Sequence, residues 1–332
     1  IFGSGSGFAA SLDLATLDGN NGFRLDGIDA NDYSGYSVST AGDVNGDGYD
    51  DMLVGAYWAG PGGNKSGETY VVFGSGEGFA ASLDLSTLDG SNGFRLDGID
   101  RDDYSGRSVS TAGDVNGDGF DDILVGARNA QPGGNWDAGE TYVVFGSGDG
   151  FAASLDLATL DGNNGFRLDG SDFGDYSGSS VSTAGDVNGD GFDDILVGAY
   201  GADPGGDSSA GETYVVFGSG NGFAASLDLG TLDGTTGFRI DGIDKSDQSG
   251  SSVSTAGDVN GDGYADMLVG AKYADTWGEN NAGETYVVFG SGEGFSANLD
   301  LSTLDGNNGF RLDGIDEKYY TGSSVSTAGD VN

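Results

Sequence analysis

The sequence Asp43-Val44-Asn45-Gly46-Asp47-Gly48-Tyr49-Asp50-Asp51 is an acidic nine-residue stretch that recurs along the whole chain. Complete copies follow at residues 114–122, 186–194 and 258–266, and a fifth copy begins at Asp330. The first aspartates of successive copies are 71, 72, 72 and 72 residues apart. A fixed period of this length is typical of repeat architectures, in which each supersecondary unit stacks on its neighbours.

The oxygen-bearing side chains of this stretch predict a calcium-binding loop. Positions 1, 3 and 5 carry Asp, Asn and Asp, and side chains at alternate positions of a tight loop converge on one point. Gly48 permits the positive φ that turns the chain. The carbonyl at position 7 is the next donor, and the Asp at position 9 completes a shell of hard oxygen ligands. An EF-hand needs Glu at position 12, where this chain has Val54, so an EF-hand is excluded.

We expect about one Ca²⁺ per complete repeat. The expected ligands are Asp43, Asn45, Asp47, Tyr49, Asp51, Asp114, Asn116, Asp118, Phe120, Asp122, Asp186, Asn188, Asp190, Phe192, Asp194, Asp258, Asn260, Asp262, Tyr264, Asp266, Asp330 and Asn332. Position 8 is Asp in three copies but Ala265 in the fourth, so it is not expected to bind the ion. A hydrogen-bonded turn without metal is the alternative, but three clustered carboxylates would repel one another without a cation.

Composition narrows the classes of function. The 332 residues carry a formal net charge of −42, which disfavours nucleic acid and anionic membranes as partners. The chain has no His and no Cys, so a Ser-His-Asp triad and the usual zinc ligands are excluded. Because weak calcium sites with dissociation constants of about 10⁻⁴–10⁻³ M are typical of extracellular modules, we expect an extracellular or cell-surface location.

The residues between the acidic loops predict four strands per repeat. In the second repeat these are residues 93–98, 104–112, 123–127 and 140–146, where β-branched and aromatic residues form short runs bounded by Gly, Asp and Asn. The connector at 151–157 is either a further short strand or an ordered loop. We therefore expect an all-β fold: a β-propeller of four-stranded blades, or an open linear array of the same blades.

The motif Ser-Gly-x-Ser-Val-x(5)-Asp-Val-Asn-Gly-Asp-Gly-[Tyr/Phe]-x-Asp-x-Leu-Val-Gly-Ala resembles the FG-GAP repeat of integrin α-subunit propellers and their bacterial relatives. The resemblance covers the whole chain and implies a calcium-binding adhesion module of bacterial type. Two positions depart from the motif, because the chain has Ser34-Gly35 in place of Phe-Gly and Tyr57 in place of the Pro of Gly-Ala-Pro. We treat residues 1–332 as one repeat domain within a longer chain. Its approximate units are 1–72, 73–144, 145–216, 217–288 and the partial 289–332.

A second acidic cluster recurs once per repeat and is first seen at Asp26, Asp29 and Asp32. Its simplest interpretation is a capped turn. Each copy also follows an arginine, which is expected to form a structural ion pair with the first aspartate of the cluster. These arginines are Arg24, Arg95, Arg167, Arg239 and Arg311.

The turn that follows the third predicted strand is the variable part of the repeat. It contains all three tryptophans, and exposed aromatic residues in loops are typical anchors for partners. Trp58, Trp136 and Trp277 are thus candidate ligand contacts, and packing over the adjacent hairpin is the equally weighted alternative.

Three classes of function follow from these patterns. The first is a secreted or cell-surface module that is stabilised by calcium and binds an extracellular protein or glycan. The second is a structural repeat protein that self-associates into a filament or surface layer. An enzyme is not expected, because the repeats are alike and no single site stands out.

Overall fold

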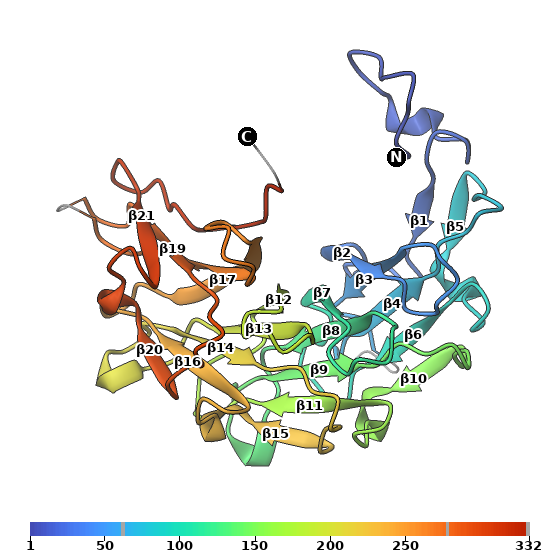
Figure 1. The fold of residues 1–332 in the computed structure, drawn as a ribbon. Helices are drawn as coiled ribbons and strands as arrows, with labels where there is room; N and C mark the ends of the chain where they lie inside the picture. Colours follow the sequence, from blue (N-terminus) through green and yellow to red (C-terminus); the bar gives the residue numbers. More distant parts are fainter. Residues whose placement is uncertain (61–63, 277–278, 330–332) are drawn as a thin grey trace.

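The computed structural model describes residues 1–60, 64–276 and 279–329. Its regular structure is β throughout except for short 3-10 turns (Figure 1). The 3-10 turns are η1 (Leu14–Thr16), η2 (Leu85–Thr87), η3 (Pro132–Gly134), η4 (Leu157–Thr159), η5 (Pro204–Gly206), η6 (Leu229–Thr231) and η7 (Leu301–Thr303). Among the described residues, no helix has the length and apolar character required to cross a membrane.

Four equivalent sheets, or blades, contain most of the strands. Blade one comprises β2 (Ser37–Gly42), β3 (Asp51–Ala56), β4 (Glu68–Val72), β6 (Gly93–Asp97) and β10 (Ser154–Asp156). Blade two comprises β7 (Ser108–Gly113), β8 (Asp122–Ala127), β9 (Glu140–Val144), β11 (Gly165–Asp169) and β15 (Ser226–Asp228). Blade three comprises β12 (Ser180–Gly185), β13 (Asp194–Ala199), β14 (Glu212–Val216), β16 (Gly237–Asp241) and β20 (Asn298–Asp300). Blade four comprises β17 (Ser249–Gly257), β18 (Asp266–Ala271), β19 (Glu284–Val288) and β21 (Gly309–Asp313), and β1 (Arg24–Asp26) pairs separately with β5 (Ser82–Asp84).

The all-β prediction is confirmed, and the four strands expected in the second repeat form. The first of them, β6, pairs with β4 of blade one, so each blade takes its fourth strand from the next repeat. In blade two, β7, β8, β9 and β11 pair in this order, with Val125 opposite Tyr142. A register shift between Thr111 and Gly113 marks the point at which β7 ends and the acidic loop begins.

The connector that sequence left as either a strand or a loop is a strand in three of the blades. β10 leaves blade two and pairs in parallel with β6 of blade one, so that Leu155 lies opposite Leu96. The same pairing joins β15 to β11 and β20 to β16. At the connector, Phe151 stacks on Phe94 with ring centroids 4.2 Å apart. Each of these connectors therefore adds a fifth strand to the blade before it.

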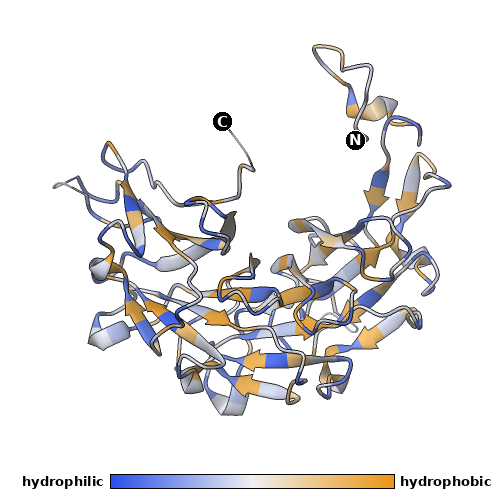
Figure 2. Ribbon diagram, in the orientation of Figure 1, coloured by the Kyte–Doolittle hydropathy of each residue, from blue (hydrophilic) through white to orange (hydrophobic). Residues whose placement is uncertain are grey.

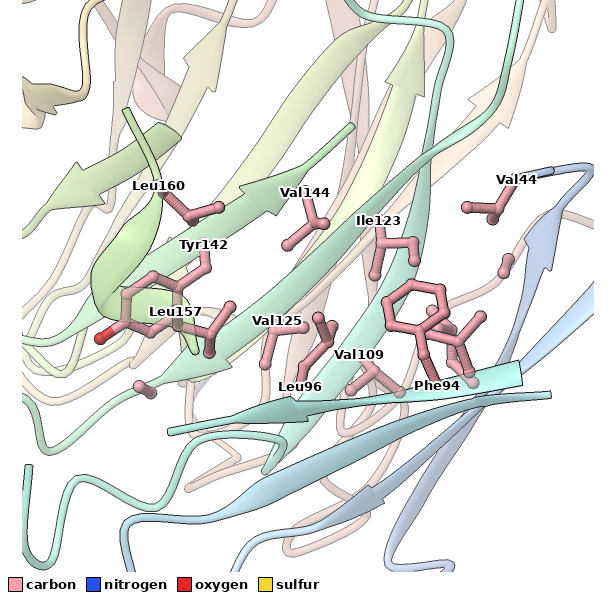
Figure 3. Close-up of a cluster of buried hydrophobic side chains, with 14 of the residues drawn as sticks. Val44, Phe94, Leu96, Val109, Ile123, Val125, Tyr142, Val144, Leu157 and Leu160 are labelled. Atoms are coloured by element: carbon pink, nitrogen blue, oxygen red, sulfur yellow. The ribbon is translucent and has the colours of Figure 1, made fainter. Parts of the chain in front are cut away.

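The hydrophobic core lies between the blades, because the central strands bury both of their faces. Figure 3 shows the cluster between blades one and two. In β9, Tyr142 and Val144 pack toward blade one, whereas Val143 packs toward blade three. Apolar residues follow the strands, and the loops are mostly hydrophilic (Figure 2). A single blade would leave these apolar faces exposed, so the blades depend on one another.

The blades form an arc with β2, β7, β12 and β17 along its inner side (Figure 1). Within the described residues the sheets do not close into a ring, which is consistent with the open-array alternative. In every blade the acidic loop joins the first strand to the second, and the variable turn joins the second strand to the third. Because neighbouring strands are antiparallel, these two connections lie at opposite ends of the blade.

Candidate functional site

The first aspartate of each acidic loop organises the backbone of that loop. In the second copy, Asp114 Oδ1 accepts the N–H groups of Gly117 and Asp118 at 2.7 and 3.1 Å. Its Oδ2 accepts the N–H of Gly119 at 2.9 Å, and Gly119 has φ +90°. Asn116 Oδ1 accepts the N–H of Asp118 at 2.8 Å. The oxygens at positions 1 and 3 therefore face the same short stretch of backbone, as the sequence pattern requires.

The other complete loops repeat this geometry. Position 5 in each loop accepts the N–H of the aromatic residue at position 7, at 2.9 to 3.0 Å. The amide of position 3 donates to the carboxylate of position 5 in all four loops. Four loops with the same side-chain directions thus lie at the same end of the four blades. The fifth copy, with Asp330 and Asn332, lies outside the described residues.

The aspartate at position 9 is the most buried acidic group of each loop. Asp122 is fully buried, and its carboxylate accepts the N–H of Val115 at 3.0 Å and that of Gly146 at 2.9 Å. Burial, with smaller contributions from the carboxylates of Asp118 and Asp114, raises the pKa of Asp122 to about 8. The carboxylates at positions 1 and 5 therefore disfavour the charged form of the carboxyl group at position 9.

The donor set of the loops fits a calcium ion by its chemistry. In the described residues, no three Asp, Glu, His or Cys side chains are arranged as a metal cage. The carboxylates accept hydrogen bonds from the loop instead, but each ionised carboxylate has about four lone-pair sites and can bind an ion as well. Asp114, Asn116 and Asp118 offer hard oxygens, and Asp122 adds a buried carboxyl group whose charged form a bound cation would favour. Such a combination suits Ca²⁺.

Comparison with known proteins identifies the repeat. The model of the FG-GAP repeat matches residues 34–72, 105–144, 177–216 and 249–288. The chain is an FG-GAP repeat protein. It is 32% identical over 229 residues to integrin alpha-PS2 of Drosophila melanogaster, which covers 67% of this chain and 14% of that protein. It is 35% identical over 201 residues to integrin alpha pat-2 of Caenorhabditis elegans, which covers 58% of this chain and 14% of that protein. It is also 32% identical over 252 residues to integrin alpha-5 of Xenopus laevis, which covers 74% of this chain and 20% of that protein. The FG-GAP chain thus spans a fifth or less of the length of these relatives.

The FG-GAP loops are linked to one another through position 8, which sequence comparison could only classify as a non-ligand. Asp121 Oδ2 accepts the N–H of Asp43 in the preceding loop at 2.8 Å. Asp193 makes the same bond to the N–H of Asp114 at 3.0 Å. Ala265 has no carboxylate for this bond, and only its backbone N–H reaches the carbonyl of Asp186, at 3.0 Å. In the sequence, position 8 shows only the pattern Asp, Asp, Asp and Ala over the four loops. This pattern does not indicate that the side chain bonds to a loop of another blade.

The aromatic residue at position 7 has a similar role between FG-GAP blades. A Cβ atom added to Gly117 would lie 2.3 Å from the Phe192 ring of the next loop. In the same way, a Cβ atom on Gly46 would meet the Phe120 ring, and one on Gly189 would meet the Tyr264 ring. The glycine at position 4 is therefore required by the close approach of a ring, and the loops act as a connected series.

The predicted arginine–aspartate ion pairs are confirmed at the opposite end of each FG-GAP blade. Arg95 Nε lies 2.5 Å from Asp97 Oδ1, and Arg167 pairs with Asp169 in the same way. Arg24, Arg239 and Arg311 form the equivalent pairs. Four of the five arginines also approach a buried glutamate, for example Glu140, which lies 3.6 Å from Arg167. These arginines are occupied by structural contacts.

The third aspartate of the second acidic cluster caps a turn, as expected. Asp103 Oδ2 accepts the N–H of Asp100 at 3.2 Å, and Asp175 accepts that of Asp172 at the same distance. Both are buried, a property that sequence did not indicate. Burial, then the charge of Glu140, raises the pKa of Asp103 to about 7.

The tryptophans lie in different surroundings. Trp136 is 64% exposed. Trp58 is half-buried, with its ring 4.8 Å from that of Tyr33 and 4.1 Å below the Lys65 ammonium. Trp277 lies outside the described residues. Trp136 therefore matches the surface interpretation, and Trp58 has packing contacts; their role as ligand contacts stays a prediction.

Proposed function

We propose that this chain is an extracellular adhesion-type module in which calcium stabilises one end of the blades and the opposite end binds a partner. The observation that carries the proposal is the series of four FG-GAP loops, each with oxygens at positions 1, 3 and 5 turned inward and a buried carboxylate at position 9. The similarity to integrin alpha subunits supports the adhesion role.

In each loop the side chains at positions 1, 3, 5 and 9 and the carbonyl at position 7 would hold the ion. In the second loop these residues are Asp114, Asn116, Asp118, Phe120 and Asp122. Bound calcium would neutralise the carboxylates that otherwise repel one another. Since Asp121 and Asp193 link consecutive loops, an ion in one loop would also stabilise the contact with the next loop.

Calorimetric titration of the chain with Ca²⁺ is the direct test, and four sites are expected in the four complete loops. If free Ca²⁺ is 100 times the dissociation constant, each site adds about 2.7 kcal/mol to the free energy of unfolding. Melting curves in millimolar Ca²⁺ and in chelator should therefore differ strongly, and Mg²⁺ should substitute poorly because it demands stricter geometry.

Matched variants in one loop separate binding from general charge effects. Asp47→Asn removes an expected ligand and should reduce the number of sites to three. Asp50→Asn makes the same charge change at position 8 of the same loop, where the side chain is exposed and is not an expected ligand. Equal effects of the two substitutions, or unchanged melting in chelator, would contradict the calcium proposal.

The adhesion role has a separate test. The purified chain, labelled at its N-terminus, should bind members of a panel of extracellular matrix proteins and glycans in Ca²⁺ and lose this binding in chelator. A chain that binds calcium but no member of a broad panel would support a purely structural role.

Self-association is a second candidate function, and the strand exchange between consecutive blades favours it, because the same pairing can extend a series of repeats. Electron microscopy in Ca²⁺ distinguishes the two candidates. Filaments would establish self-association, whereas discrete particles would favour the partner-binding module.

A further inference from the structure

The end of the blades opposite the acidic loops carries a regular sequence pattern of its own. The residue that follows Gly-Ala at the end of the second strand is Tyr57, Arg128, Tyr200 and Lys272 in blades one to four. Aromatic and basic residues thus alternate from blade to blade. The acidic loops precede these strands, and the Gly-Ala residues end them. This series therefore lies at the end of the blades opposite the acidic loops.

The members of the series contact each other, or their neighbours, across blade boundaries. Arg128 Nη1 donates to the hydroxyl of Tyr200 at 3.3 Å. The Lys272 ammonium lies 5.6 Å from the centroid of the same Tyr200 ring. Tyr176 stacks on Tyr200 with centroids 5.3 Å apart and planes 7° apart, and Arg128 lies over Tyr176 at 5.8 Å. We call Arg128, Tyr176, Tyr200 and Lys272 the aromatic–cation strip.

A related cluster extends the strip over blade one. The Tyr36 and Tyr57 rings are 4.6 Å apart, and the Arg107 guanidinium lies 5.0 and 5.2 Å from their centroids. Tyr57 also reaches Tyr104 of blade two, with centroids 5.9 Å apart. Rings and cations therefore continue from blade one to blade four along the same end.

The basic side chains at this end differ in their contacts from most others of the chain, whose net charge is −42. Seven of the twelve basic side chains form ion pairs with carboxylates. Among the described residues, the basic side chains without such a pair are Lys65, Arg107, Arg128, Lys245 and Lys272. All of these except Lys245 lie over aromatic rings at this end of the blades.

Arg128 and Lys272 flank Tyr200 as a pair of like charges. Burial, and then the charge of Arg128, lowers the pKa of Lys272. Asp137 is a neighbouring carboxylate, but it accepts a hydrogen bond from Asn129 at 2.9 Å. Burial, and then the charge of Asp137, raises the pKa of Tyr176. Arg128 and Lys272 both contact Tyr200 and neither forms an ion pair with a carboxylate of the described residues, an arrangement that a bound anion would stabilise.

We propose that the aromatic–cation strip binds a carboxylated glycan, with a sugar ring against Tyr176 and Tyr200 and its carboxylate between Arg128 and Lys272. The inference rests on the proposed binding role and adds the chemical class of the ligand. A uronic acid offers an apolar face of C–H groups and a carboxylate at the ring edge. Partly exposed tyrosine rings and adjacent cations match both features.

An acidic peptide is the main alternative, and the arrangement of the strip favours the glycan. A Glu-rich peptide would use the cations but has no flat apolar face for the tyrosines. A polymer of uronic acids repeats ring and carboxylate together, as the strip repeats ring and cation from blade to blade. The net charge of the chain repels all polyanions, so binding of either one requires a local site of this kind.

The test is calorimetric titration of the chain with a hexamer of galacturonic acid at fixed free Ca²⁺ and physiological salt. The fully methyl-esterified hexamer and a hexaglutamate peptide are the comparison ligands. We expect binding of the acid hexamer and at least about tenfold weaker binding of both comparison ligands, because each lacks one of the two features. If hexaglutamate binds as tightly as the acid hexamer, the ligand class is acidic peptides and not glycans. If the ester binds as tightly, the cations have no role in binding.

Variants locate the site. Arg128→Gln and Lys272→Gln should each weaken binding by about five- to tenfold, and Tyr200→Ala by a similar factor. Lys245→Gln is the matched control, because Lys245 is exposed and lies outside the strip. Unchanged melting temperatures would show that all variants fold. Equal effects of the strip variants and the control, or no binding of the acid hexamer, would overturn the inference; binding of another ligand in the panel would then still support the proposed function.

Discussion

Replacing a buried acid by its neutral isostere should make this protein more stable at neutral pH. Asp175 is 5% exposed and lies beside Asp172, Asp203 and the buried Glu212, at a cavity of about 270 Å³. Arg239 also lines this cavity, but it already pairs with Glu212 at 3.4 Å. Burial, followed by the charges of Glu212, Asp172 and Asp203, raises the pKa of Asp175 to about 7.

The sign of the effect follows from the two states of the chain. The folded protein holds a proton on Asp175 up to about pH 7, whereas the unfolded chain releases it near the ordinary value of 3.8. The stability that this group contributes is therefore fully present below pH 4 and is lost as the pH rises to 7. Asp175→Asn keeps an oxygen for the N–H of Asp172 and carries no charge at any pH.

The size of the effect can be estimated from the same shift. The complete shift would correspond to about 4 kcal/mol. Solvent in the adjoining cavity screens the charges, so we expect a gain of about 1–2 kcal/mol in the free energy of unfolding at pH 8. The advantage of the variant should grow from pH 4 to 7 and stay constant above pH 7.

Urea denaturation of both proteins in chelator, at pH 4.5, 6 and 8, measures this difference. Chelator removes any contribution of metal to the pH dependence. Asp207→Asn is the control, because it makes the same change of net charge on an exposed side chain of the neighbouring turn. A variant that is less stable at every pH, or a control that shows the same gain, would refute the reasoning.

Two further predictions concern the contacts between blades. Asp121→Ala removes the 2.8 Å hydrogen bond from the N–H of Asp43 and should lower the free energy of unfolding by about 1–2 kcal/mol. Ala265→Asp supplies the side-chain hydrogen bond that the fourth loop lacks and should raise the melting temperature. No change in either variant would mean that the loops are independent. Phe223→Ala removes the ring that stacks 4.2 Å from Phe166 and should cost about 3 kcal/mol in urea denaturation. A cost below about 1 kcal/mol would show that the connector adds little to blade two.

Local patterns were sufficient to predict the blades. The Glu-Thr-Tyr-Val-Val strand and the Ile-Leu-Val-Gly-Ala strand combine high β propensity with Gly and Asp at their ends, and both form as expected. The ion pair of Arg167 with Asp169 was also predictable, because the two residues are two positions apart on one face of a strand.

Contacts between distant parts of the chain were beyond the reach of the same patterns. Ser154–Asp156 is too short to form a strand by propensity, and it becomes one only because β6 of the preceding blade offers a free edge. The bond from Asp121 to Asp43 spans 78 residues, so its role appears only when the blades are stacked. The aromatic–cation strip depends on the stacking of blades for the same reason.

The parallel pairing of β6 with β10 has a mechanical consequence. When tension acts along the chain, β6 is pulled toward the N-terminus and β10 toward the C-terminus, so the two parallel strands slide against each other. Their hydrogen bonds are then loaded together in shear and must break together, instead of opening one by one as in a zipper. The connectors of the later blades are loaded in the same direction. A series of such units would resist stretching at each connection before any blade lost its core.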